Sequence, residues 1–142
     1  MKRIILPLLL LFVGLSSFAG DINKAILQSF HQQFGQPTEV VADEVEGMAR
    51  ISFKQNNERF AAYYSQEGEL LVISKEINSD QLPLIMKQKL DKHLKDAVVS
   101  ECYQMESKGS ISFVVVTQTA KKTTTYRNDG TGWYQVTSKR KK

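Results

Sequence analysis

The sequence predicts an α+β fold of two tandem repeats, each a helix followed by four antiparallel strands, all joined in one sheet. In two segments, apolar residues recur every three or four positions, which is the spacing of one helix face. Short strand-like runs separated by turn residues follow each segment. We expect the two helices to pack on one face of the sheet and to leave the other face open.

The first twenty residues have the pattern of a secretory signal peptide. Two positive charges precede an apolar run over residues 4–15, and small residues follow at Ser17 and Ala19. The apolar run is shorter than the roughly 20 residues that a transmembrane helix needs. We therefore predict a signal peptide over residues 1–19, cleavage after Ala19, and a periplasmic or secreted protein with no stable membrane insertion afterwards.

The first repeat is predicted over residues 22–77. Its helix covers residues 22–34, with Asp21 or Asn23 as the N-cap. Gly35 and Pro37 end this helix, because glycine accepts the left-handed cap and proline cannot continue a helix. The apolar stripe consists of Ile22, Ala25, Ile26, Phe30 and Phe34. The predicted strands cover residues 38–45, 49–55, 59–65 and 69–77.

The second repeat is predicted over residues 79–138. Ser79 or Asp80 caps its helix, and Pro83 lies in the first turn, where its missing N–H costs nothing. The apolar stripe consists of Leu82, Ile85, Met86, Leu90 and Leu94. The predicted strands cover residues 98–105, 110–119, 122–127 and 133–137. A shift of 60 residues aligns the two stripes and places Ile-Ser-Phe at 51–53 on Ile-Ser-Phe at 111–113, which indicates an internal duplication.

The charge balance argues against nucleic acid as a partner. The chain has 19 basic and 15 acidic residues, and removing the signal peptide leaves 17 basic residues. Four of these form a basic tail at residues 139–142, predicted to be a solvated terminus, so the domain over residues 20–138 is slightly acidic.

No motif in the mature chain indicates catalysis, a metal or a cofactor. The two histidines, His31 and His93, belong to no metal-binding pattern, and Cys102 is the single cysteine. Cys102 is interpreted as a half-buried strand residue, and it has no partner for an internal disulfide. The sequence therefore predicts a protein that is not an enzyme.

Two pairs of adjacent aromatic residues are the strongest candidates for a binding surface: Tyr63 with Tyr64, and Trp133 with Tyr134. Adjacent strand residues point to opposite faces, so one residue of each pair should face away from the core. Exposed Tyr and Trp supply large contact area at small entropic cost. Ordinary cross-strand packing on that face is the alternative explanation for these residues.

The order of elements, the Leu82-Pro83 helix start and the tyrosine-to-glycine turns at residues 64–68 and 126–130 carry a resemblance. Over residues 22–137 the chain resembles the PepSY-like, β-lactamase-inhibitor-like (BLIP-like) proteins exported by Bacteroidetes-type bacteria. The resemblance implies a tandem α+β fold and a role in binding or restraining another protein, such as a peptidase. It implies no catalytic residues.

The sequence thus predicts an exported, non-catalytic module that binds another envelope or secreted protein through the open sheet face. The alternative is a small-ligand carrier with a pocket between sheet and helices. Its pocket would be lined by Phe30, Phe34, Ile51, Phe53 and Met86.

Overall fold

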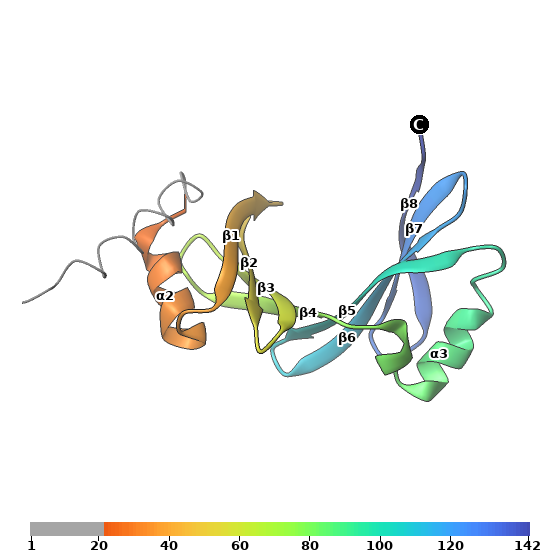
Figure 1. Cartoon of the computed structure of the whole chain (residues 1–142), viewed down its shortest axis with the longest axis horizontal. Helices are drawn as coiled ribbons and strands as arrows, with labels where there is room; N and C mark the ends of the chain where they lie inside the picture. The colour runs from red at the N-terminus through yellow and green to blue at the C-terminus, as the bar shows by residue number, and fades with distance from the viewer. Residues whose placement is uncertain (1–21) are drawn as a thin grey trace, which may run out of the picture. The chain divides into compact units, whose positions relative to one another are not determined.

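The computed structural model describes residues 22–142, so the predicted signal peptide lies outside the described residues. Eight strands form one antiparallel sheet and follow one another in chain order, β1 to β8 (Figure 1). With the two α-helices described within residues 22–142, this arrangement confirms the predicted α+β class. The chain divides into two units, one ending at Val72 and the other covering Ile73–Lys142. None of the helices within residues 22–142 is both long enough and apolar enough to cross a membrane.

Helix α2, Lys24–Phe34, opens the first unit. The side chain of Asn23 caps it by accepting a hydrogen bond from the backbone N–H of Ala25 at 2.9 Å. The helix ends at Gly35, whose φ of 69° suits glycine and whose N–H donates to the carbonyl of His31. Both predicted helix signals, the Asn23 cap and the Gly35 stop, are confirmed.

Strands β1, Thr38–Val45, β2, Met48–Gln55, and β3, Glu58–Tyr64, follow α2. Positive φ angles at Glu46 and Gly47 and at Asn56 and Asn57 make the tight turns between them. In the β2–β3 ladder, Ala49 lies opposite Tyr64, Ile51 opposite Ala62 and Phe53 opposite Phe60. These pairs face α2.

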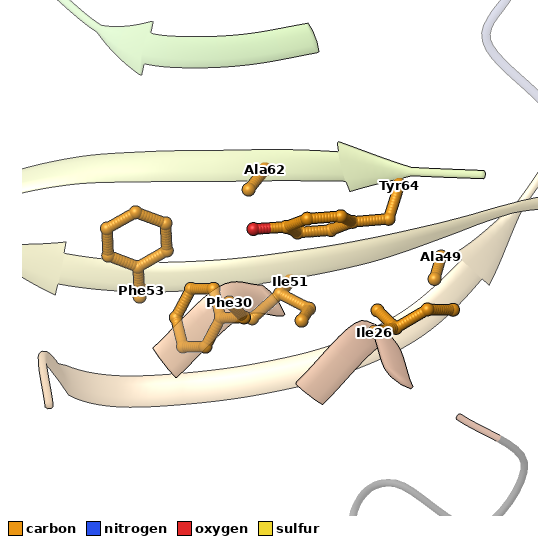
Figure 2. Close-up of a cluster of buried hydrophobic side chains, with 7 residues drawn as sticks. All are labelled: Ile26, Phe30, Ala49, Ile51, Phe53, Ala62 and Tyr64. Carbon is orange, nitrogen blue, oxygen red and sulfur yellow. The ribbon is translucent and has the colours of Figure 1, made fainter. Parts of the chain in front are cut away.

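One hydrophobic cluster holds the first unit together. Figure 2 shows side chains of α2 and those of β2 and β3 meeting in this cluster, with the ring of Tyr64 among them. Phe30 and Phe53 pack edge to face with ring centroids 5.1 Å apart. The buried members are Ile26, Phe30, Ala49, Ile51, Phe53, Ala62 and Tyr64.

Strand β4, Leu70–Glu76, runs from the first unit into the second. A 3₁₀ turn over Ser79–Gln81 comes next, and α3 begins only at Leu84 and ends at Asp91. The prediction that one helix would contain Leu82 and Leu94 was therefore wrong. Leu82 has an extended ψ of 144°, because the residue before a proline is disfavoured in the α conformation, and Pro83 is the N-cap rather than a first-turn residue.

The remaining strands are β5, Val98–Ser107, β6, Ser110–Gln118, β7, Lys122–Asn128, and β8, Trp133–Arg140. A second hydrophobic cluster joins β5, β6 and β8 to the segment around α3. Its buried members are Ile77, Leu82, Leu90, Cys102, Phe113 and Val115. Trp133 packs against this cluster, and its indole N–H donates to the carbonyl of Met86 at 2.8 Å.

The last strand is longer than predicted. Lys139 lies opposite Thr123 and Arg140 opposite Lys122 in the β7–β8 ladder, and the backbone N–H of Lys141 donates to the carbonyl of Lys121. Half of the run predicted as a solvated basic tail is therefore strand. The charge pattern concealed this because long basic side chains are fully compatible with an exposed edge strand.

Candidate binding surface

In the first unit, the sheet has an outer face that points away from α2. On β2 and β3 the side chains alternate, so Arg50, Ser52, Ala61 and Tyr63 face opposite to the cluster residues. Val41 and Asp43 of β1 lie opposite Ser52 and Arg50 and join the same face. We call these six residues the first outer face.

A cross-strand row of Asp43, Arg50 and Tyr63 crosses this face. The Nε of Arg50 donates to Oδ1 of Asp43 at 2.8 Å, and its Nη2 donates to the other carboxylate oxygen, which makes a two-point pair. This hydrogen-bonded pair lowers the pKa of Asp43 and raises the pKa of Arg50. The neighbouring Tyr63 raises the pKa of Arg50 further, to a smaller extent. The guanidinium is therefore held by Asp43 on the strand position opposite the half-buried Tyr63.

The second unit has a comparable outer face, opposite to the cluster that contains Leu90. Its central row runs across five strands, from Glu76 through Tyr103, Val114 and Arg127 to Tyr134, each opposite the next. Tyr134 is 44% exposed. We call these five residues the second outer face. The hydroxyl of Tyr103 donates to a carboxylate oxygen of Glu101 at 2.5 Å, which orients that ring along the strand.

In each of the two predicted aromatic pairs, one side chain points to an outer face and the other points toward a hydrophobic cluster. Tyr63 and Tyr134 belong to the outer faces. Tyr64 is fully buried, its hydroxyl donates to the side-chain oxygen of Gln33 at 2.6 Å, and burial raises its pKa to about 12. Trp133 is half-buried beneath α3. Tyr64 is therefore a core residue, while Tyr63 and Tyr134 lie where a partner could contact them and Trp133 is partly covered by the second cluster.

Sequence reasoning missed the charged neighbours of the two outward tyrosines. Arg50 lies opposite Tyr63, and Arg127 lies opposite Tyr134. Each outer face thus places an arginine beside a tyrosine on the adjacent strand. The signal for Arg50 was present in the strand lengths, because the tight turn between β2 and β3 sets their register and places Arg50 opposite Tyr63.

Four of the residues expected to line a small-ligand pocket belong to one packed cluster. The rings of Phe34 and Phe53 lie 4.8 Å apart, those of Phe30 and Phe53 lie 5.1 Å apart, and Ile51 is fully buried between the helix and the strands. Met86, the fifth predicted lining residue, packs with the second cluster instead.

A polar depression of about 270 Å³ lies in the second unit, beside the 3₁₀ turn. The residues around it are Glu76, Ile77, Asn78, Ser79, Asp80, Val99, Ser100, Glu101 and Cys102. Burial raises the pKa of the Cys102 thiol to about 11, which leaves little of the nucleophilic thiolate at neutral pH. Within residues 22–142, no three His, Cys, Asp or Glu side chains gather closely enough to hold a metal ion.

Comparisons with known proteins show the fold. No family model and no curated protein matches this sequence. A protein of Bacteroides eggerthii that is thought to be periplasmic aligns with 83% of this chain and 88% of its own, with a TM-score of 0.72 and 7% identity. A DUF2874 family protein of Bacteroides uniformis aligns over the same shares, with a TM-score of 0.71 and 10% identity.

A BLIP-like protein of Bacteroides fragilis aligns with 83% of this chain and 85% of its own, with a TM-score of 0.63 and 15% identity. The structural part of the predicted resemblance, the BLIP-like α+β fold, is therefore confirmed. The more specific PepSY-like assignment remains a prediction.

Proposed function

We propose that this chain is a non-catalytic binding module of the bacterial cell envelope that docks another protein on the outer faces of its sheet. The observation that carries the proposal is the pairing of an outward tyrosine with an arginine from the neighbouring strand in each unit, Tyr63 with Arg50 and Tyr134 with Arg127. Tyrosine and arginine are enriched among the residues that dominate protein interfaces.

The two pairs are suited to different roles. Arg50 is already held by Asp43 in a two-point ion pair, so it forms a rigid platform beside Tyr63. Tyr134 is more exposed, and Arg127 beside it is exposed as well. We therefore expect Tyr134 and Arg127 to contribute more binding free energy, because they lose more contact with water when a partner covers them.

The predicted signal peptide over residues 1–19 would export the chain to the periplasm or beyond, and the likeness to a Bacteroides protein thought to be periplasmic agrees with that compartment. The similarity to a BLIP-like protein agrees with an inhibitor-like role toward an envelope enzyme. The repeated order of one helix and four strands agrees with an internal duplication that provides two binding surfaces.

The proposal is tested by affinity capture with residues 20–142 as bait, using the envelope fraction of the source organism and reading the captured proteins by mass spectrometry. Wild type is compared with Tyr63→Ala and Tyr134→Ala. Ile111→Ala is the matched control, because Ile111 is 51% exposed but lies on the same side of β6 as buried Phe113 and Val115.

We expect wild type and Ile111→Ala to enrich the same envelope protein. Tyr134→Ala should weaken its capture by about tenfold or more, as truncation of a tyrosine that dominates an interface does, and Tyr63→Ala should weaken it less. Circular dichroism of each variant verifies that the fold is intact. Equal capture by all four proteins would show that the outer faces are not the docking surface.

A further inference from the structure

Strand β8 has an edge that no other described strand covers. It is the last strand of the sheet, and among the strands within residues 22–142 its one neighbour is β7. Seven of its eight residues are exposed. Such a strand presents backbone N–H and C=O groups along its free side, and these can pair with another strand.

The side chains of β8 differ strongly between its two ends. Trp133 and Tyr134 begin the strand, uncharged side chains, including the exposed Val136, fill its middle, and Lys139 and Arg140 end it. In an antiparallel pair the beginning of one strand lies beside the end of the other. A second copy of β8 would therefore bring cations to aromatic rings, which attract each other.

We propose that β8 pairs with β8 of a second copy of this chain, antiparallel and about a two-fold axis between Val136 and Thr137. This register overlaps all eight residues of both strands. It places Trp133 opposite Arg140, Tyr134 opposite Lys139, Gln135 opposite Ser138, and Val136 opposite Thr137 of the second copy.

The β-bulge in β8 selects this register. Opposite β7, the ladder passes from Tyr126–Gln135 to Thr125–Thr137, so Val136 is the additional residue. Because of the bulge, Tyr134 and Lys139 share the outer face although five positions separate them, and Trp133 and Arg140 share the opposite face. The three pairs outside the bulge therefore each have both side chains on the same face. A shift by one residue would oppose side chains from different faces.

The register also keeps like charges apart. Lys139 of one copy would lie five strand positions from Lys139 of the other, roughly 17 Å at the usual rise per residue. That separation exceeds the Debye length at physiological ionic strength, about 8 Å, so repulsion between the two basic ends is largely screened. The pairing is closed and two-fold, which limits association to a dimer at this edge.

The dimer goes beyond the proposed partner binding, and it is tested with the purified protein alone. The measurement is the molar mass of residues 20–142 across a concentration series, by sedimentation equilibrium or light scattering. Wild type should pass from monomer to dimer, and the backbone amides of β8 should become protected from hydrogen exchange as it does so. A wild-type protein that stays monomeric up to its solubility limit would overturn the proposal.

Two matched variants test the register. Gln135→Lys/Ser138→Lys places like charges opposite each other twice across the axis, whereas Gln135→Glu/Ser138→Lys places opposite charges there. Both variants lose the 3.3 Å contact between the hydroxyls of Ser138 and Thr124, so they differ only in the charge at position 135.

We expect the dissociation constant of the dimer to be about tenfold or more higher for the Lys/Lys variant than for the Glu/Lys variant. Circular dichroism confirms that both are folded. If the two variants dimerise equally, or if a wild-type dimer leaves the β8 amides unprotected, the β8 pairing is wrong. Neither result depends on whether the outer faces bind another protein.

Discussion

At the scale of single residues, Tyr63 and Tyr64 show how one step along a strand changes the role of a side chain. The two are chemically identical, yet Tyr64 fills the centre of a hydrophobic cluster while Tyr63 lies beside Arg50 on the outer face. The sequence predicted that one of them would face away from the core but could not choose between them. The choice depends on which face α2 covers, and that is a property of tertiary packing.

Cys102 carries a pH-dependent contribution to stability. Burial raises the pKa of its thiol from an ordinary 9.0 to about 11. Above pH 9 the unfolded chain therefore loses this proton before the native chain does. The contribution is complete below pH 9 and is lost as the pH rises through 11. Tyr64, with a pKa raised from 10.0 to about 12, acts in the same direction.

We therefore expect the free energy of unfolding to fall as the pH rises from 9 to 11, and to fall less steeply in Cys102→Ala. Urea unfolding across this pH range measures both slopes. The Ala variant is less stable at neutral pH because it loses packing, so the comparison uses the slope and not the absolute value. Equal slopes would mean that the thiol titrates in the native protein much as it does in the unfolded chain.

At the scale of elements, the strands were predicted more accurately than the second helix. The predicted bounds of β1 agree with the structure. Strand β2 begins one residue earlier than predicted, and β3 begins and ends one residue earlier. The errors are small because turn residues mark strand ends clearly. The predicted second helix was too long at both ends compared with α3. The apolar spacing of Leu82 and Leu94 matches a helix, but Pro83 forces Leu82 out of the helical conformation.

Helix α3 gives a direct test of which apolar positions stabilise the fold. The predicted stripe contained both Ile85 and Leu90, but Ile85 is 66% exposed and Leu90 is 1% exposed. We expect Leu90→Ala to lower the free energy of unfolding by about 2–5 kcal/mol, as for other buried leucines. Ile85→Ala should change it by less than about 0.5 kcal/mol.

Chemical denaturation of both variants under the same conditions makes this comparison. Because both replacements leave alanine, a good helix former, helix propensity does not account for the difference. A large loss in Ile85→Ala would mean that the side chain is covered in solution.

At the scale of the whole molecule, residues 22–142 contain two hydrophobic clusters that share no buried residue. One contains Phe30 and the other contains Val115. The sequence predicted two repeats that share one sheet and one layer of helices. It could not show two cores, because periodicity identifies apolar faces without identifying which faces meet.

Separate clusters predict separate responses to core mutations. We expect Phe30→Ala to lower the protection of backbone amides from hydrogen exchange chiefly in β2 and β3. Val115→Ala should lower it chiefly in β5 and β6, since each variant weakens only its own cluster. Hydrogen exchange resolved by residue distinguishes the two patterns. If either variant lowers protection uniformly across residues 22–142, the sheet unfolds as one cooperative unit.

Trp133, whose indole N–H donates to the carbonyl of Met86, is an intrinsic fluorescent reporter of the protein's unfolding. Trp133 is the only tryptophan in the chain, and its indole lies half-buried between α3 and the start of β8. Its emission spectrum therefore reports the local environment of the second unit and contains no direct signal from the cluster around Phe30. An unfolding curve followed by tryptophan fluorescence describes that unit, whereas circular dichroism averages over the entire chain.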